Sequence, residues 1–260
     1  MTYNNSASEI ERCLKSVAEA CARADVVLDC EIHAIDNGKE TYDAAYRKFD
    51  VKIHASQGNV GFGRGHNALM RDAFERGADF YIAVNPDGFL HYDAVESLIR
   101  MASADRTPAL IEAIQIPEEH PKWYDPETFE TPWASGALLM IPKRIYENIG
   151  GFDDDFFMYC EDVDLSWRAR AAGFKVKACP SALFYHPVMD REFDLQIHKR
   201  FLRAGIILAR KWGGHAFERS LLEAALAHGA DLDGLQAIEP HVQTGVADFS
   251  HNFSFGPTRW

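Results

Sequence analysis

Two neighbouring carboxylates, Glu161 and Asp162, precede the helical pattern VDLSWRARAAG. Acidic residues in a first helical turn favour the helix macrodipole, and this alone would explain Glu161, Asp162 and Asp164 without any chemistry. The aromatic run FFMY just upstream supports a second interpretation, because an aromatic wall excludes water and raises the pKa of a carboxylate. A carboxylate of this kind can accept a proton from a hydroxyl, so the pair is a candidate acid–base site.

Asp87 follows the apolar run FYIAV, within the turn NPDG. Asn, Pro, Asp and Gly are common β-turn residues, and a plain turn is the simpler interpretation. The alternative is a metal site, because a hard divalent cation binds carboxylate oxygen. Asp87 is therefore the candidate metal ligand of this segment.

The glycine-rich segment GNVGFGRGHN and the dipeptide Asp36-Asn37 also follow extended segments. The glycine spacing matches neither a Walker nor a Rossmann motif. Glycines allow close approach of the backbone to a ligand, and Arg64 could pair with a phosphate. Asp36 and Asn37 could form a simple Asx-turn before Gly38, or contact a ligand.

Helical and extended patterns alternate through the first part of the chain. Ser6 and Glu9 fit a capping box, which predicts a first helix over residues 8–24. We then expect a strand in VVLDCEIHAIDNG, a short helix in TYDAAYRKF, a strand in VKIHA, the glycine-rich loop, a helix in HNALMRDAFERG and a strand in DFYIAVNPDG. This order indicates a parallel α/β architecture, in which ligands bind at the carboxyl ends of the strands.

The overall composition excludes several classes of protein. A net charge of −12 argues against a broad nucleic-acid surface, and a hydrophobic fraction of 47% is enough for a sizeable core. No apolar run approaches the roughly 20 residues that cross a bilayer. The five cysteines are odd in number and show no CxxC spacing, which suggests reduced thiols in the cytoplasm.

Seven motifs occur in a characteristic order: TYNN, IDNG, GNVGFGRGHN, VNPDG, WASGALLMIPK, GGFDDDFFMYCEDVDLSWRARAAGF and FYH. Together they resemble the inverting nucleotide-sugar glycosyltransferases of family two, and within them the rhamnosyltransferase-like branch that builds bacterial surface polysaccharides. The resemblance covers about residues 2–212. It implies a GT-A fold, an α/β/α sandwich, over residues 1–189, with a helical extension over residues 190–260 packed on it.

The resemblance also implies a role for each candidate residue. Asp162, the second acid of the ED pair, would take the proton of the acceptor hydroxyl, and Glu161 would orient the acceptor. Asp87 would bind Mn²⁺ or Mg²⁺. His186 would be a further ligand that favours Mn²⁺. The alternative is that His186, at the end of a strand, is a structural residue. The family usually has Asp-x-Asp where this chain has Asn85, so we expect weaker metal binding that depends on the nucleotide.

Substrate contacts follow from the same resemblance. The residues expected to contact the nucleotide sugar are Tyr3, Asp36, Asn37, Arg64, Asn67, Asn85 and Asp87. Trp133 is either a stacking surface for the acceptor sugar or, with equal weight, a core residue. The donor would be dTDP-rhamnose or a UDP-sugar, and the acceptor a glycan or a lipid-linked glycan.

The segment beyond His186 is expected to form helices that pack on the catalytic domain. It carries an apolar stripe and the basic residues Lys199, Arg200, Arg203, Arg210 and Lys211. These could dock a cytoplasmic protein on the anionic inner face of a membrane, where lipid-linked acceptors reside. The aromatic side chains of the last segment are expected to pack back on the molecule; they are Phe249, Phe253, Phe255 and Trp260.

Two alternative functions stay open. A sugar-phosphate nucleotidyltransferase shares the alternating pattern, but it needs a glycine-rich, Arg-containing loop after its first strand, which this sequence lacks. A catalytically silent subunit that binds nucleotide sugars is compatible with Asn85. The same alternative is compatible with the opening MTYNN, since an apolar strand precedes TYN in the resembling family. We therefore expect a gap or an edge in the sheet where a strand ending at Thr2 belongs, with Tyr3 near Asp36.

Overall fold

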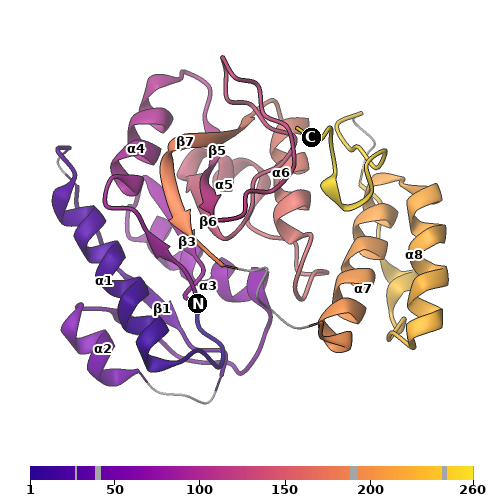
Figure 1. Ribbon diagram of the computed structural model, residues 1–260, viewed down its shortest axis with the longest axis horizontal. Helices are drawn as coiled ribbons and strands as arrows, with labels where there is room; N and C mark the ends of the chain where they lie inside the picture. The colour runs from indigo at the N-terminus through magenta and orange to yellow at the C-terminus, as the bar shows by residue number, and fades with distance from the viewer. Residues whose placement is uncertain (27, 39–41, 188–192, 242–244, 260) are drawn as a thin grey trace.

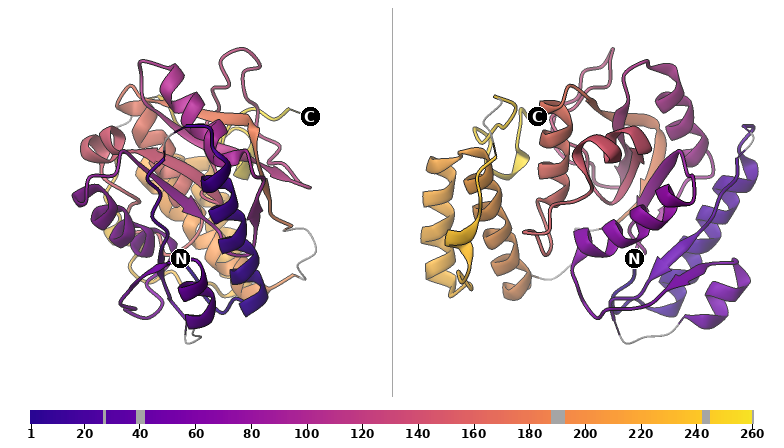
Figure 2. Two further views of the ribbon diagram at one scale, coloured as in Figure 1. Left: turned by 90° about the vertical axis from the view of Figure 1, so that its left-hand side faces the viewer. Right: turned by 180° about the vertical axis from the view of Figure 1, so that it is seen from behind.

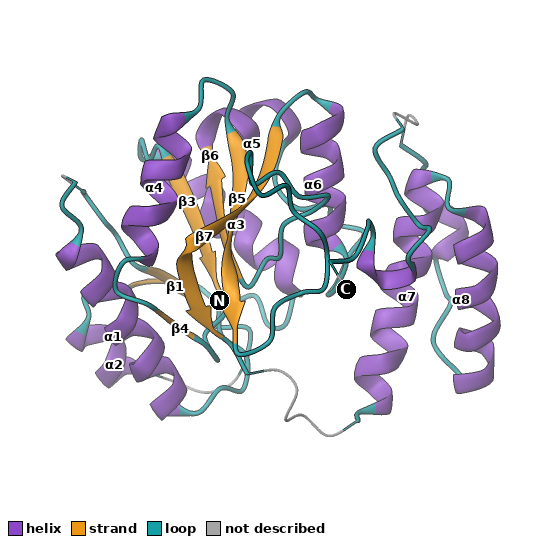
Figure 3. Ribbon diagram, turned by 45° about the horizontal axis from the view of Figure 1, so that its top comes forward, coloured by secondary structure: helices purple, strands orange, loops and turns teal. Residues whose placement is uncertain are grey.

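The computed structural model describes residues 1–26, 28–38, 42–187, 193–241 and 245–259, and its helices lie around a central sheet (Figures 1 and 3). The helices are α1 (Ala7–Arg23), α2 (Asp43–Lys48), α3 (Phe62–Glu75), α4 (Ala94–Ala104), α5 (Lys143–Ile149), α6 (Glu161–Ala171), α7 (Leu195–Trp212) and α8 (His215–His228). The strands are β1 (His33–Ile35), β2 (Lys52–His54), β3 (Phe80–Val84), β4 (Phe89–Leu90), β5 (Ala109–Ile116), β6 (Leu138–Pro142) and β7 (Lys175–Tyr185).

The strands form two sheets. Five strands in the order β3-β6-β5-β7-β4 make a mixed sheet, in which only β5 and β7 run parallel, while β1 and β2 form a separate parallel pair. The expected α/β class is confirmed, but the expectation of a parallel architecture is wrong for the larger sheet. The reason is that β6 and β4 run against all of their neighbours.

The opening residues pair with the smaller sheet. The Thr2 N–H donates to the Ile35 carbonyl at 3.0 Å, and the Asn37 N–H donates to the Thr2 carbonyl at 2.8 Å. Among the described strands none joins β1 to β3, although α3 packs against both of them. The expected edge at Thr2 is present, and the Tyr3 loop begins directly beside Asp36.

The larger sheet is buried on both faces because side chains alternate along its strands. On β6, Leu139 and Ile141 pack in one apolar cluster with α3, α5 and α6. Leu138 and Met140 point the other way, into a cluster with α1 and α4. This sandwich supports the loops at the ends of β3 and β7.

Several element boundaries differ from the sequence expectations. The Ser6–Glu9 capping box is present at the start of α1 as expected, whereas the strand expected in VVLDCEIHAIDNG is only the short β1. Helix α3 begins at Phe62, so the second half of the expected glycine-rich loop is helical. A Cβ on Gly63 would lie 2.9 Å from the Phe152 Cβ, and glycine therefore lets this first turn pack tightly.

Helices α7 and α8 lie side by side at the end of the molecule opposite α1 and α2 (Figures 1 and 2). They share an apolar cluster with α6 and with the aromatic residues of the last segment. The Trp167 ring of α6 lies 5.2 Å from Phe249 and 5.8 Å from Phe255, between ring centroids. The expected return of the last segment is therefore confirmed for these residues, while Trp260 lies outside the described residues.

The basic residues of α7 are largely bound within the molecule. Arg203 donates to backbone carbonyls in the segment after α8, Arg210 contacts Glu218 at 2.6 Å, and Lys211 lies 2.9 Å from Asp153. This pairing weakens the membrane-docking interpretation of these side chains. Within the described part of the chain, no helix has both the length and the apolar character needed to cross a membrane.

Candidate active site

Asp87 and His186 meet at one edge of the large sheet. Asp87 stands in the turn after β3, and His186 follows the last residue of β7, where its N–H donates to the Ile116 carbonyl at 2.8 Å. The His186 Nε2 atom lies 3.2 Å from an Asp87 carboxylate oxygen. The proximity expected from the sequence is present, although the roles of the two residues as ligands stay a prediction.

A hydrogen-bonded chain fixes the orientation of the His186 ring. Gln115 of β5 donates through Nε2 to the Ser135 hydroxyl at 3.0 Å, which turns its Oε1 toward His186 Nδ1 at 2.8 Å. With the side chains in this orientation, Nδ1 donates to Gln115 Oε1, and Nε2 faces the Asp87 carboxylate. The buried Nε2 atom has no hydrogen-bond partner of good geometry among the described residues. An imidazole nitrogen and a carboxylate oxygen placed in this way fit a shared divalent cation.

The carboxylates of Glu161 and Asp162 open helix α6. Backbone strain marks this start, because Tyr159 and Cys160 both have positive φ angles, of 74° and 63°. Asp162 is partly exposed and accepts hydrogen bonds from the N–H groups of Gly136 and Val163, both at 2.9 Å. Glu161 is almost fully buried, and its Oε2 atom has no hydrogen-bond partner in the described part of the structure.

Both carboxyl groups of the pair hold their protons more tightly than usual. Burial, followed by the neighbouring charge of Asp162, raises the pKa of Glu161 to about 8. Burial also raises the pKa of Asp162, but the two backbone N–H groups and the charge of Lys122 oppose the increase. Since these compensating groups act on Asp162, we infer that Asp162 ionises first and that Glu161 is still protonated near neutral pH.

A buried ion pair behind the site was not anticipated from the sequence. Lys122 Nζ lies 2.7 Å from a carboxylate oxygen of Glu112, which stands in the middle of β5. Burial lowers the pKa of Lys122, and the Glu112 carboxylate counteracts this shift. Burial likewise raises the pKa of Glu112. The signal was available in the sequence, because Glu112 and Gln115 interrupt the otherwise apolar strand ALIEAIQI.

Trp133 lies in the core instead of at an open surface. Its side chain is 6% exposed, its Nε1–H donates to the Ser254 carbonyl at 2.7 Å, and Lys122 Nζ stands 3.7 Å from the ring centroid. One face of the ring is therefore covered by a cation. This packing agrees with the core alternative and leaves no open face for the stacking of an acceptor sugar.

Of the residues expected to contact the nucleotide, one group lies at the carboxyl end of β1: Tyr3, Asp36 and Asn37. Asn37 is buried, and its Nδ2 donates to the Gly61 carbonyl at 3.2 Å, so the β1 edge is tied to the start of α3. Asp36 accepts the Gly38 N–H at 2.9 Å, which is the Asx-turn of the simpler interpretation. Tyr3 is 45% exposed beside them. The contact of these residues with a nucleotide stays a prediction.

Arg64 and Asn67 bind the loop before α6. Arg64 donates to the Asp154 carbonyl at 2.9 Å, and Asn67 both donates to the carbonyl and accepts from the N–H of Phe152, at 2.7 and 2.8 Å. Asn67 therefore joins α3 to the loop before α6, and its expected contact with the nucleotide sugar stays a prediction. The backbone N–H of Asn85 donates to Ala137 at 2.8 Å, which places Asn85 between β3 and β6 near Asp87.

Comparison with solved structures establishes the class of fold. The mannosyltransferase PcManGT from Pyrobaculum calidifontis, solved with GDP-Man and Mn²⁺, matches with a TM-score of 0.62 and 16% identity, over 88% of this chain and 67% of that one. This likeness shows the GT-A fold of nucleotide-sugar transferases. The chain itself belongs to glycosyl transferase family 2, whose family model matches residues 1–166.

Two relatives with assigned activities are similar along most of the chain. The N-acetylglucosaminyl-diphospho-decaprenol L-rhamnosyltransferase of Mycobacterium tuberculosis (strain H37Rv) is 26% identical, over 68% of this chain and 71% of that protein. Rhamnosyltransferase WbbL of Escherichia coli (strain K12) is 25% identical, over 61% of this chain and 74% of that protein. The similarity agrees with the rhamnosyltransferase-like branch indicated by the motifs.

Proposed function

We propose that this family 2 glycosyltransferase is metal-dependent and inverts the configuration of the sugar it transfers. It would move rhamnose or a similar sugar from dTDP-rhamnose or a UDP-sugar to a hydroxyl of a glycan or lipid-linked glycan in surface polysaccharide synthesis. The relatives that transfer rhamnose support this choice of substrates. The observation that carries the proposal is the pair Glu161–Asp162, two adjacent carboxyl groups with raised pKa values and different surroundings.

Asp162 is suited to be the base because it is partly exposed and ionises before its neighbour. Its carboxylate would take the proton of the acceptor hydroxyl. The acceptor oxygen would then form a bond to the anomeric carbon on the face opposite the diphosphate. The bond from that carbon to the diphosphate oxygen would break, and the electron pair would leave with the nucleoside diphosphate. Protonated Glu161 can donate a hydrogen bond, which suits it to orient the acceptor.

Asp87 and His186 are the residues that would hold the cation. The His186 Nε2 atom lies 3.2 Å from the Asp87 carboxylate, which supports this choice, and an imidazole ligand favours Mn²⁺ over Mg²⁺. When bound, the ion would supply positive charge that stabilises the departing diphosphate. Asn85 adds a neutral oxygen where an acid would bind more strongly, so the nucleotide is expected to contribute to metal affinity. The same residue keeps the silent nucleotide-sugar-binding subunit as a second candidate.

Incubation with a nucleotide sugar and Mn²⁺ separates the candidate functions. A glycosyltransferase should release nucleoside diphosphate slowly even without an acceptor. A nucleotidyltransferase should instead release pyrophosphate from a nucleoside triphosphate and a sugar phosphate, and a silent subunit should do neither. Calorimetric titration with a panel of dTDP- and UDP-sugars would then identify the donor.

Substitutions at Asp87 and His186 test the metal assignment. Asp87→Ala should abolish Mn²⁺-dependent donor binding, and His186→Ala should weaken it, because the first removes a charged ligand and the second a neutral one. His91→Ala is the matched control, since His91 lies 3.7 Å from Asp93 in a similar His–Asp pair that is more exposed. Unchanged Mn²⁺ dependence in both site variants would refute the assignment.

A further inference from the structure

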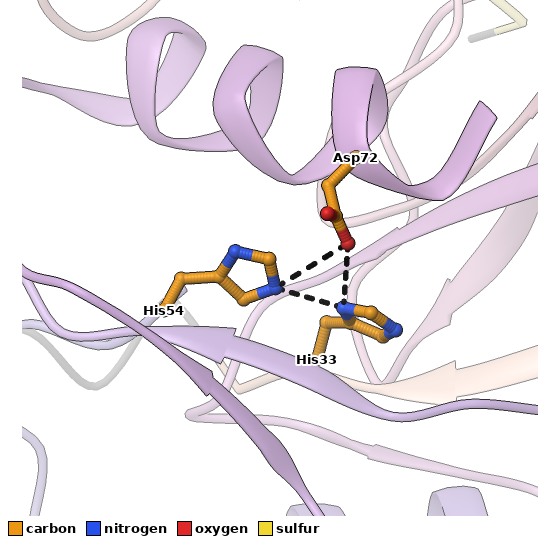
Figure 4. A group of neighbouring side chains, drawn as sticks. All are labelled: His33, His54 and Asp72. Atoms are coloured by element: carbon orange, nitrogen blue, oxygen red, sulfur yellow. Dashed lines mark hydrogen bonds and ion pairs between the residues drawn. The ribbon is translucent and has the colours of Figure 1, made fainter. Parts of the chain in front are cut away.

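Two histidines and an aspartate converge on the side of the β1–β2 sheet that faces α3. His33 comes from β1, His54 from β2 and Asp72 from α3, and the three side chains point toward one another (Figure 4). In the pairing of the two strands, His54 of β2 lies opposite Ile35 of β1. Ile35 is two residues after His33 on the same strand. Because side chains alternate along a strand, this spacing places both histidines on one face.

The three facing atoms have the separations of ligands around one ion. His33 Nδ1 and His54 Nε2 lie 2.8 Å apart and share a hydrogen bond, which an ion would replace, and they lie 3.6 and 3.8 Å from the same Asp72 carboxylate oxygen. A tetrahedral ion with bonds of about 2.0–2.1 Å places its ligand atoms about 3.3 Å apart. The observed distances lie on both sides of this value, so small side-chain rotations would accommodate an ion.

Neighbouring charges support the same geometry. His33 Nε2 lies 3.0 Å from a Glu31 carboxylate oxygen, which holds the proton on Nε2 and leaves the Nδ1 lone pair facing the cluster. Lys52 and Arg76 also contact Glu31 and hold its carboxylate in place. Arg76 Nε lies 4.0 Å from Asp72, farther than the cations of the second cluster, described below, lie from their carboxylates.

We propose that His33, His54 and Asp72 form a second metal site, which binds a divalent transition metal of the Zn²⁺ type. Two imidazole nitrogens and one carboxylate suit Zn²⁺, whereas Ca²⁺ and Mg²⁺ prefer oxygen ligands alone. The site is built from elements other than those that carry Asp87 and His186. Three protein ligands leave a fourth position for water.

The location of the site indicates a structural role. A two-stranded sheet is only marginally stable by itself, and an ion bound here would link both of its strands to α3. At the other end of β1, Asn37 donates to the Gly61 carbonyl at the start of α3, beside the expected nucleotide edge. The ion would therefore hold β1 and α3 together at the end away from that edge.

A second cluster of ligand-type residues carries no such proposal. Asp153, Asp164 and His241 also lie close together. Lys211 Nζ is 2.9 Å from Asp153, and Arg168 Nε is 2.7 Å from Asp164, so cationic side chains already neutralise these carboxylates. A metal ion would have to displace them.

Titration of the whole chain with Zn²⁺ against a chromogenic chelator tests the proposal. The wild type and the matched control His91→Ala should bind one equivalent tightly, and His54→Ala and Asp72→Asn should bind it at least about tenfold more weakly. Asp72 and His54 are 39% and 24% exposed at the side chain, so both variants are expected to fold. His186→Ala should keep the Zn²⁺ affinity of the wild type, which distinguishes this site from the one proposed for Mn²⁺.

Two further measurements make the outcome decisive. Co²⁺ should give the intense visible absorption of tetrahedral coordination in the wild type and not in His54→Ala. Zn²⁺ should also raise the melting temperature of the wild type more than that of Asp72→Asn, because the ion binds only the folded state. Equal Zn²⁺ affinity in the wild type and both cluster variants would overturn the proposal, and so would a weak octahedral Co²⁺ spectrum.

Discussion

Glu161 and Asp164 belong to the same first turn of α6, and their side chains are 5% and 0% exposed, yet their surroundings are opposite. Asp164 lies 2.7 Å from Arg168 Nε, and it accepts the Trp212 Nε1–H at 2.9 Å. Burial alone would raise the pKa of Asp164, but the Arg168 charge and the hydrogen bonds from His241, Arg168 and Trp212 hold it at about 2. Glu161 Oε2 has no hydrogen-bond partner among the described residues, and the pKa of Glu161 is raised to about 8.

The difference separates a structural carboxylate from one that is available to a ligand. Asp164 joins α6 to α7 through Trp212, and its charge is balanced by Arg168 and by hydrogen bonds within the protein. Glu161 presents an oxygen without a hydrogen-bond partner among the described residues, next to the partly exposed Asp162. Uncompensated burial of an ionisable group is a common property of catalytic and binding sites. Under the proposed function, the first turn of α6 therefore combines a catalytic pair, Glu161 and Asp162, with the structural carboxylate of Asp164.

The largest effect is expected for Asp162→Asn. The amide keeps the shape of the side chain but cannot take a proton, and its single oxygen can accept only one of the two backbone N–H groups, of Gly136 and Val163, that bond to the carboxylate. Turnover should fall by roughly 10²–10⁴-fold, the usual contribution of a positioned base. Donor affinity should hardly change, because the nucleotide is expected at Asp36 and Asp87. Single-turnover transfer with saturating donor measures the step in isolation from binding.

Glu161→Gln is the control for this experiment and should reduce the rate less, because Gln can still orient an acceptor. A dead Glu161→Gln enzyme together with an active Asp162→Asn enzyme would show that the two roles are reversed. If Asp162 were only a residue of a first helical turn, its substitution would cost about 0.3–1 kcal/mol of stability and leave turnover intact.

Asp164→Asn should act on stability instead of on chemistry. The change leaves the Arg168 guanidinium without its counterion, while the Arg168 side chain is only 15% exposed. Removal of one partner of a buried ion pair typically costs about 3–5 kcal/mol. Urea unfolding should show this loss, and donor binding of the folded fraction at low temperature should be retained. Asp93→Asn is the exposed control, and we expect it to change stability by less than about 0.5 kcal/mol. An unchanged unfolding free energy for Asp164→Asn would show that the Asp164 carboxylate does not stabilise the fold.

The sequence predicted the positions of the site elements well because local signals determine them. The turn at Asp87, the strand end at His186 and the helix start at Glu161 follow from apolar runs and turn residues. The α/β class followed from the alternation of patterns. The direction of β6 could not be predicted, since pairing depends on contacts between residues far apart in the chain. The short β1 likewise reflects tertiary pairing instead of local propensity.

The sequence could not distinguish Glu161 from Asp164. Both are acids in one helical turn, and their partners come from other elements: Trp212 stands at the end of α7, and Lys122 in the loop after β5. The placement of Trp133 was undecided for the same reason, since the cover of its ring by Lys122 is a tertiary contact. The roles of such residues depend on burial and on partners, which only the fold supplies.

The smallest effect is the pH dependence of stability in Glu161→Gln, and it tests the difference between Glu161 and Asp164 most directly. The pKa of Glu161 is raised from 4.5 to about 8 on folding. Between these values the folded protein keeps a proton that the unfolded chain has lost, so this residue makes stability fall as the pH rises. Gln has no such proton. The variant should therefore gain stability relative to the wild type as the pH rises, with the full gain above about pH 8.

Each unit of difference in pKa corresponds to about 1.36 kcal/mol, and we expect a gain of at least about 1 kcal/mol at high pH. Urea unfolding at about pH 5, 7 and 9 measures the difference between variant and wild type, in which titrating groups other than Glu161 and its coupled neighbour Asp162 cancel. The contribution of Asp164 to the pH dependence of stability has the opposite sign. Its pKa is lowered from 3.8 to about 2, so the stabilisation by its carboxylate is lost only as the pH falls through that range. Parallel stability curves for Glu161→Gln and the wild type would mean that Glu161 is compensated in the folded protein. In that case the first turn of α6 would contain two structural carboxylates, and the distinction between Glu161 and Asp164 would fail.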